Sequence, residues 1–111
     1  AFLDISQMSK GHTLVIPKKH YQFIWDIPEI DEYFKFIKDI GNHFRDIGYK
    51  YIDTMTMGRQ IPHAHVHLVP HNNGDTDWVK ALEAVYNMQL DENRRPSFKE
   101  MKTIQKQFQI D

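Results

Sequence analysis

Three histidines alternate strictly with apolar residues within residues 60–70, which read Gln-Ile-Pro-His-Ala-His-Val-His-Leu-Val-Pro. A period of two is typical of a half-buried β-strand. We therefore expect the apolar members of this segment to enter the core and its histidines to share the opposite face. The expected core residues are Ala64, Val66 and Leu68, and the histidines are His63, His65 and His67. Three imidazoles on one strand face form a reactive surface that core packing does not require.

Three further segments read as strands. They are residues 1–4, residues 12–17 and residues 49–57. Gly11 is available for a backbone turn before the second of them. The short connection 58–62 suggests that the strand at 49–57 and the histidine strand are antiparallel neighbours.

Between these strands, the segment 28–47 has apolar residues at helical spacing with charged residues between them. Asp26 is a plausible N-cap, since a proline follows it closely, and Gly48 is a suitable C-terminal stop. The apolar positions are Ile30, Tyr33, Phe34, Ile37, Ile40, Phe44 and Ile47. This pattern predicts one amphipathic helix that covers a sheet.

The last part of the chain predicts two more helices. Residues 75–90 have apolar positions at near-helical intervals, and Ser97 to Glu100 is a capping-box pattern that opens a helix through Ile110. Residues 91–96 form a charged link between the two. These helices could pack on the domain, cover a ligand site or extend a dimer interface, and we assign them no chemistry.

Composition narrows the class of protein. The chain of 111 residues has room for one domain, and its formal net charge of −1 argues against a broad nucleic-acid footprint. Without cysteine it has neither a disulfide framework nor thiolate ligands for zinc. It shows no secretory pattern and no apolar run long enough to span a bilayer. We expect a cytoplasmic protein that binds neither a membrane nor nucleic acid.

The histidines allow a metal reading as well as a catalytic one. Two imidazoles at alternate strand positions can bind zinc if other ligands converge on them. However, alternate side chains on a strand are roughly 6.6 Å apart, so one ion does not easily take all three histidines. Residues 68–72, which follow, contain no acidic ligand and no cysteine. We expect no metal and no other cofactor at the histidines.

The segment His-Ala-His-Val-His-Leu-Val resembles the signature of the histidine triad (HIT) family of nucleotide hydrolases and transferases. A second block, residues 1–6 followed by residues 11–20, resembles the strand pair of the family's nucleotide pocket. The resemblance covers about the first 71 residues. It implies an α+β fold, with an antiparallel sheet and a covering helix in domain 1–71, and a homodimer. The helices that periodicity predicts in residues 72–111 form a C-terminal extension beyond the resemblance.

The resemblance implies roles for four histidines. In the family the middle histidine attacks phosphorus, so His65 is the expected nucleophile. A neutral imidazole is a competent nucleophile near neutral pH, and a phosphorylated imidazole is a good leaving group. His63 and His67 would stabilise the developing charge and protonate the leaving group. His12 occupies the family's fourth histidine position and would support the cluster by hydrogen bonding.

Substrate contacts are expected at both sides of the histidines. In the family the aspartate corresponding to Asp4 accepts hydrogen bonds from the ribose hydroxyls, while Phe2 and Ile5 would offer apolar surface to the base. Arg59 and Gln60 bring donors to the mouth of the histidine face, where an anion is expected. The compact Gly-Arg-Gln-Ile-Pro-His stretch lacks the longer loop and the Asn-x-Gly of many family members.

Together these features predict cleavage of a nucleoside 5'-phosphoryl bond through a nucleotidyl-histidine intermediate, with a purine nucleotide as substrate. Phosphoramidates, adenylylated compounds and dinucleoside polyphosphates all remain open, because Pro70 resembles one branch of the family and the Phe-x-Asp-Ile-Ser block another. Two alternatives are a catalytically silent nucleotide-binding regulator and a metal-dependent hydrolase. Family members normally have a helix and a hairpin before the Phe-x-Asp-Ile block, so we expect that an N-terminal segment is missing.

Overall fold

The computed structural model describes residues 1–74 and 76–109, and the chain divides into two compact units, 1–78 and 79–111. The elements follow in the order β1 (Phe2–Leu3), β2 (Thr13–Val15), the 3-10 helix η1 (Ile24–Asp26), α1 (Ile30–Asp46), β3 (Tyr51–Met55), β4 (Val66–His71), α2 (Thr76–Leu90), the 3-10 helix η2 (Glu92–Arg94) and α3 (Phe98–Phe108). The expected α+β fold is confirmed.

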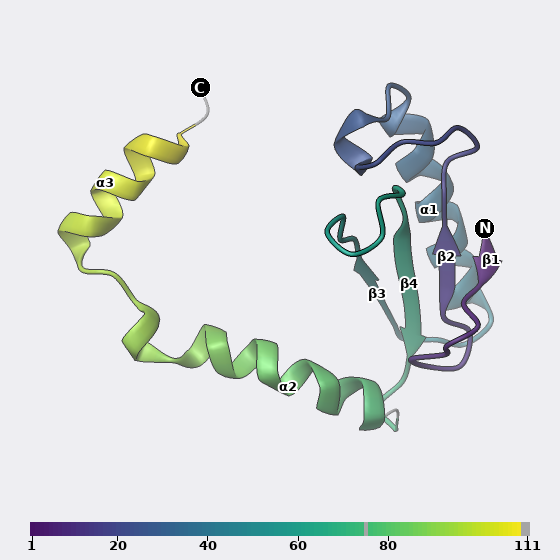
Figure 1. Ribbon diagram of the computed structural model, residues 1–111. Coiled ribbons are helices and arrows are strands. Elements are labelled where there is room, and N and C mark those ends of the chain that lie inside the picture. The colour runs from purple at the N-terminus through teal and green to yellow at the C-terminus, as the bar shows by residue number, and fades with distance from the viewer. Residues whose placement is uncertain (75, 110–111) are drawn as a thin grey trace. The chain divides into compact units, whose positions relative to one another are not determined.

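The four strands form one sheet in the order β1-β2-β4-β3, and every neighbouring pair is antiparallel (Figure 1). The expected pairing of the strand after the helix with the histidine strand is therefore confirmed. His67 lies opposite Leu14 on one side and opposite Met55 on the other. The histidine strand is thus central, with β1 beyond β2. Gly11, in the turn between these two, has a φ of +96°, which a side chain would disfavour.

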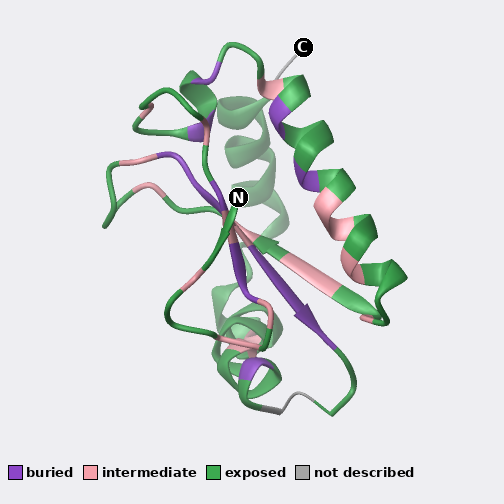
Figure 2. Ribbon diagram, turned by 90° about the vertical axis from the view of Figure 1, so that its right-hand side faces the viewer, coloured by how far each residue is buried: buried purple, intermediate pink, exposed green. Residues whose placement is uncertain are grey.

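The core lies between the sheet and α1. Strand β4 is largely buried (Figure 2), and its residues Val66 and Leu68 join Tyr33 and Ile37 of α1 in one apolar cluster. The Tyr33 hydroxyl donates to the carbonyl of Val15 in β2. Burial raises the pKa of Tyr33 to about 12, so the hydroxyl stays a neutral donor that fastens the helix to the sheet.

The expected start of the helix was wrong. Asp26 ends η1, and its carboxylate accepts from the Phe23 backbone N–H at 3.3 Å, whereas α1 begins at Ile30 without a side-chain cap. The reason lies at Pro28, which disfavours helical backbone in the residue before it. Ile27 is accordingly extended, with φ −77° and ψ 115°. The expected stop is confirmed, because Gly48 follows the helix with a φ of +110°.

Two apolar positions of the helix also differ from the expectation. Phe34 is 42% exposed and Ile47 is 60% exposed, so neither joins the core. Successive helix positions are rotated by about 100°, which turns Phe34 away from the face that carries buried Tyr33. Ile47 is the residue after the last helical turn.

The histidine segment is only partly a strand. Pairing begins at Val66, so His63 and His65 precede β4. The backbone there bonds elsewhere: the Ala64 N–H donates to the carbonyl of Tyr21 at 2.6 Å. Ala64, like the other two expected core residues, is nevertheless almost fully buried, at 2% exposure. The alternation therefore predicted the burial of these core residues correctly, although the pairing of the backbone begins later along the chain than expected.

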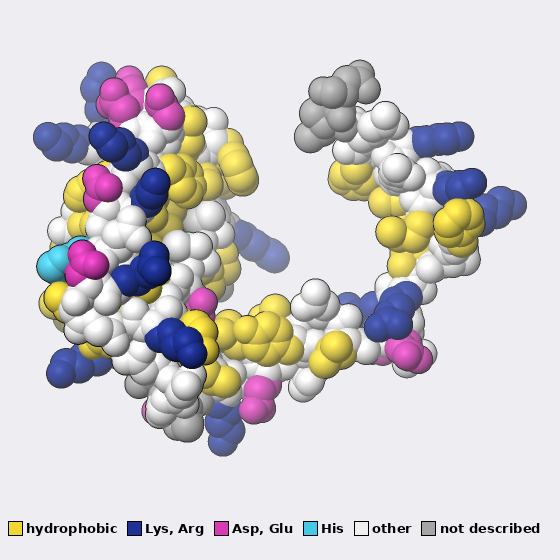
Figure 3. Space-filling model, turned by 180° about the vertical axis from the view of Figure 1, so that it is seen from behind, with side chains coloured by type: hydrophobic (Ala, Val, Ile, Leu, Met, Phe, Trp, Pro, Cys, Tyr) yellow, Lys and Arg dark blue, Asp and Glu magenta, His cyan; other side chains and the backbone are white. Residues whose placement is uncertain are grey.

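The unit at residues 79–111 contains most of α2, then η2 and α3. Ser97 caps α3, its side chain accepting from the Glu100 N–H at 3.2 Å, as the capping-box pattern predicted. Hydrophobic side chains lie at the surface of both helices (Figure 3). Asp75 and Ile110, the expected first and last helical residues, lie outside the described residues. Within the described part of the chain, no helix has the length and apolarity needed to cross a membrane.

Candidate active site

A mostly apolar hollow of about 290 Å³ lies at the histidine end of the sheet. It is lined by Phe2, Asp4, Leu14, Ile16, Ile61, His63, His65 and His67. All three histidines of the alternating segment therefore meet at one cavity, although only the last of them is in a strand. A larger hollow of about 560 Å³ beside α1 has no histidine in its wall, so it offers no comparable chemistry.

His65 is held by the backbone that precedes it. Its Nδ1 lies 2.7 Å from the carbonyl oxygen of His63. Because a carbonyl can only accept, Nδ1 carries the proton and Nε2 keeps a lone pair. The carbonyl of His65 itself accepts from Thr56 Oγ1 at 2.7 Å, and His65 is only 7% exposed. The ring is therefore oriented with its Nε2 as the nitrogen left to react.

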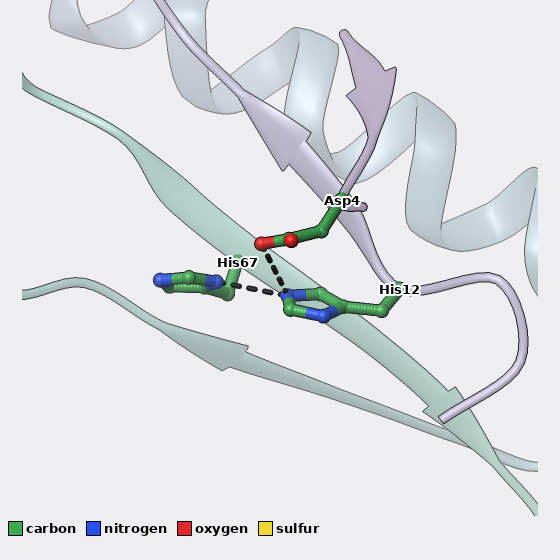
Figure 4. Close-up of side chains that lie close together, drawn as sticks. All are labelled: Asp4, His12 and His67. Atoms are coloured by element: carbon green, nitrogen blue, oxygen red, sulfur yellow. Dashed lines mark hydrogen bonds and ion pairs between the residues drawn. The ribbon is translucent and has the colours of Figure 1, made fainter. Parts of the chain in front are cut away.

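His67 is linked to a second, fully buried histidine. Its Nδ1 lies 2.9 Å from His12 Nε2 (Figure 4). On the other side of the His12 ring, Nδ1 lies 3.1 Å from the Ser6 carbonyl oxygen, which requires a donor. The Met8 N–H, at 3.4 Å from the same nitrogen, is the weaker contact. His12 Nε2 then accepts from His67, and His67 Nε2 retains a lone pair.

The surroundings of His67 favour its neutral form. Its pKa is lowered below the ordinary value of 6.5, chiefly by burial and further by the neighbouring imidazoles of His65 and His12. The carboxylate of Asp4 acts in the opposite direction and raises the pKa. At neutral pH the lone pair on His67 Nε2 is therefore available to accept a proton.

Asp4 is placed by the turn between β1 and β2. Its Oδ1 accepts from the Ser6 N–H at 2.8 Å, and its Oδ2 lies 3.7 Å from His12 Nε2. The side-chain amide of Gln7 donates to the carbonyls of both Asp4 and His12. These bonds tie the carboxylate to the same local structure as the supporting histidine.

The remaining expected substrate contacts divide into two groups. Phe2 lines the hollow with Asp4, whereas Ile5, at 99% exposure, does not. Arg59 and Gln60 are exposed and also lie outside the lining. Their assignment as substrate contacts stays a prediction.

Sequence reasoning did not find several residues at this site. Leu14, Ile16 and Ile61 complete the apolar wall, and the exposed ring of His20 lies edge-on to His63 with ring centroids 4.8 Å apart. A strand was expected at residues 12–17, but nothing in the sequence indicated that one face of this strand borders a cavity.

One group of three side chains among the described residues has the spacing of a metal site. It consists of Asp4, His12 and His67, whose ligand atoms all lie within 4.8 Å of one another. Sequence spacing could not reveal it, because the first two residues are far along the chain from the third. The cluster that supports the histidine face thus also has donor atoms of the types and spacing that a metal ion requires.

Taken together, the site has an oriented imidazole with a free nitrogen, a neutral neighbour that can exchange protons, and an apolar wall beside a carboxylate. Such a set suits nucleophilic attack on a group whose polar end meets the histidines and whose flat or apolar end meets the wall.

Comparison with known proteins identifies the family of the chain. The HIT domain model matches residues 1–74, and the chain belongs to the HIT family.

Relatives are found in distant organisms. The chain is 39% identical over 100 residues to an uncharacterised HIT-like protein of Methanocaldococcus jannaschii, covering 83% of this chain and 76% of the relative. It is 37% identical over 84 residues to protein hit of Bacillus subtilis, covering 68% of this chain and 58% of that protein. An uncharacterised HIT-like protein of Borreliella burgdorferi is 29% identical over 85 residues, covering 68% of this chain and 61% of the relative. The search of solved structures gave no significant match.

Proposed function

We propose that this protein cleaves a nucleoside 5'-phosphoryl bond through a nucleotidyl intermediate on His65. The observation that carries the proposal is the bond from His65 Nδ1 to the His63 carbonyl, which leaves Nε2 as a nucleophile at the wall of the cavity. Membership of the HIT family supports a nucleotide hydrolase or transferase.

In the first step, the lone pair of His65 Nε2 attacks phosphorus and the bond to the leaving group breaks. A protonated neighbour, His67 or His63, donates to the phosphoryl oxygens and transfers its proton to the leaving group. An anionic phosphate in the cavity favours that protonated form. The products of this step are the free leaving group and the nucleotidyl-histidine.

In the second step, water attacks phosphorus and the bond between phosphorus and His65 breaks. The neighbour that gave up its proton in the first step, for example neutral His67 through Nε2, accepts one from the water. A nucleoside monophosphate leaves, and both imidazoles return to their starting state. The scheme needs no metal.

The ligand contacts follow from the same cavity. Asp4 would accept hydrogen bonds from the ribose hydroxyls, since a carboxylate can accept two donors at once, and Phe2 with the aliphatic wall would contact a purine base. Phosphoramidates, adenylylated compounds and dinucleoside polyphosphates are the candidate substrates. A homodimer, which the family implies, and a cytoplasmic location, which the composition indicates, are further predictions.

Intact-mass analysis after brief mixing with adenosine 5'-phosphoramidate and excess chelator tests the proposal. A transient adenylyl adduct or released adenosine monophosphate is expected for the wild type and for His43→Ala, whose histidine is exposed on α1. Neither is expected for His65→Ala. The same comparison is then made with a dinucleoside polyphosphate.

The alternatives give different results. Nucleotide binding without an adduct or product from either substrate would indicate a silent regulator and contradict the proposal. Activity that the chelator abolishes would indicate a metal-dependent hydrolase.

A further inference from the structure

The side chains of Asp4, His12 and His67 lie close together, with their donor atoms pointing toward one another (Figure 4). His12 Nε2 lies 2.9 Å from His67 Nδ1 and 3.7 Å from Asp4 Oδ2, and all three ligand atoms are within 4.8 Å of one another. A tetrahedral zinc ion with bonds of about 2.1 Å holds its ligand atoms about 3.4 Å apart. The distances of 2.9 Å and 3.7 Å lie on either side of that value, and the ligand atoms of Asp4 and His67 lie within 4.8 Å of each other, so these two side chains would have to approach for one ion to bind all three donors.

The types of donor also suit zinc. Two imidazole nitrogens and a carboxylate oxygen are common zinc ligands, and three protein ligands leave a fourth position for water or a substrate oxygen. Softer sites rich in sulfur are excluded because the chain has no cysteine. The chemistry therefore favours Zn²⁺ over Cu⁺ and, with two imidazoles, over Mg²⁺.

The outer contacts of this cluster are those of a preformed site. His12, only 1% exposed, places its Nδ1 3.1 Å from the Ser6 carbonyl oxygen, an arrangement that fixes Nε2 as the coordinating nitrogen. The Ser6 N–H donates to Asp4 Oδ1 at 2.8 Å, so Oδ2 is the carboxylate oxygen that can bind a metal. One backbone segment thus orients two of the three donors.

We propose that Asp4, His12 and His67 form an inhibitory zinc site. Binding shifts the proton of His67 from Nδ1 to Nε2, so both imidazoles remain neutral and no proton is released from the pair. The lone pair on Nε2 that would accept a proton from water is then lost. Asp4 is also withdrawn from the ribose hydroxyls, so zinc and a nucleoside exclude each other. The inhibition and the exclusion rest on the function proposed above, whereas the binding of zinc does not.

Calorimetric titration with Zn²⁺ alone tests the site. The titration uses the full chain carrying His65→Ala, which removes the proposed nucleophile and keeps all three donors. We expect one site whose affinity falls by about 10-fold or more when Asp4→Asn or His12→Gln is added. The control is His43→Gln, which removes an exposed histidine on α1 and should leave the affinity unchanged.

Two results would overturn the site. One is an affinity unchanged by Asp4→Asn, a substitution of similar size that is measured alongside a circular dichroism melt to confirm folding. The other is an affinity reduced to the same extent by His20→Gln, which would place the ion at the exposed histidines instead. Should His12→Gln fail to fold, the comparison of Asp4→Asn with His43→Gln still decides.

Competition with adenosine tests the exclusion separately. Adenosine keeps the ribose hydroxyls and lacks the phosphates that would themselves chelate zinc. Its apparent dissociation constant should rise in proportion to Zn²⁺ in the His65→Ala protein, and the rise should disappear in the variant that also carries His12→Gln. Independent binding of zinc and adenosine would overturn the exclusion. Because no turnover is involved, failure of the zinc site is distinguishable from failure of the adduct experiment.

Discussion

Strand β4 carries two histidines on the same face, and their surroundings differ. His67 is half-buried, borders the cavity and pairs with a second imidazole. His71, at the end of the strand, is 7% exposed, and its Nε2 lies 2.8 Å from Asp53 Oδ2. The Trp78 indole donates to the same oxygen at 2.8 Å, and Tyr51 stacks on the ring with centroids 5.3 Å apart.

The difference shows what separates a reactive histidine from a structural one. Near His67, the carboxylate of Asp4 acts on the pKa of the ring through its charge, and Nε2 keeps its lone pair because Nδ1 donates to His12. Around His71, the carboxylate of Asp53 is directly bonded and already shared with an indole. Each histidine has a nearby carboxylate, so the deciding feature is whether a ring nitrogen remains free beside a cavity.

The largest expected effect is on catalysis. We expect His67→Gln to lower kcat/KM for nucleotide release by about 10²–10⁴-fold, the usual contribution of a group that transfers a proton. The matched change is Asp53→Asn in the His71 cluster, which consists of His71, Asp53, Trp78 and Tyr51. This change should leave kcat/KM within about threefold of the wild type, because Asp53 lies outside the cavity lining. Equal losses in the two variants would remove the distinction between the clusters.

The residues around His71 should matter for stability rather than for catalysis. Asp53→Ala leaves the buried His71 Nε2 and Trp78 Nε1 without their acceptor, and we expect a loss of about 2 kcal/mol in the free energy of unfolding. Urea denaturation measures it. Asp39→Ala, on the exposed side of α1, is the control and should change stability by less than about 0.5 kcal/mol. A loss no larger than that of the control would contradict a structural role for the His71 cluster.

A smaller effect is expected from the aromatic contact. Tyr51→Leu removes the ring stacked on His71 and should cost about 0.5–1 kcal/mol, since Tyr51 is itself 40% exposed. Tyr51→Phe keeps the stack and should retain the stability of the wild type. If the two variants lose the same stability in urea denaturation, the hydroxyl rather than the ring is responsible.

The sequence predicted much of the fold because periodicity reflects burial. Alternation identified Val66 and Leu68 as core residues, and helical spacing identified Tyr33 and Ile37. Boundaries were less predictable, since they depend on local backbone competition. The clearest case is Pro28, which delays the helix that Asp26 was expected to cap.

The site was less predictable than the fold. The spacing of the histidines suggested His65 and His67, but the Asp4–His12–His67 cluster depends on contacts between strands that no short motif encodes. The same limit applies to His71, which the sequence does not distinguish from its neighbours. Its acceptor Asp53 is on β3, and its cover Trp78 follows β4.

The smallest expected effect is electrostatic and concerns His67. NMR titration of its ring should give a pKa below 6.5 in the wild type. Asp4→Asn should lower that pKa further, because the carboxylate favours the imidazolium. The change should be small, because the effect of Asp4 is weaker than those of burial, His65 and His12. Asp53→Asn, at the other cluster, should leave the titration of His67 unchanged.

The same shift fixes the direction of a change in stability. In the unfolded chain His67 takes up a proton near its ordinary pKa of 6.5, whereas the folded protein resists protonation. Its contribution to stability is therefore present above pH 6.5 and is lost as the pH falls from there toward the lowered pKa. Urea denaturation above and below pH 6.5 should show a smaller loss in His67→Gln than in the wild type. An equal loss of stability in both proteins would mean that burial of His67 does not contribute to the acid sensitivity.

In the NMR titration, a His67 pKa that rises in Asp4→Asn would contradict the assigned influence of the carboxylate.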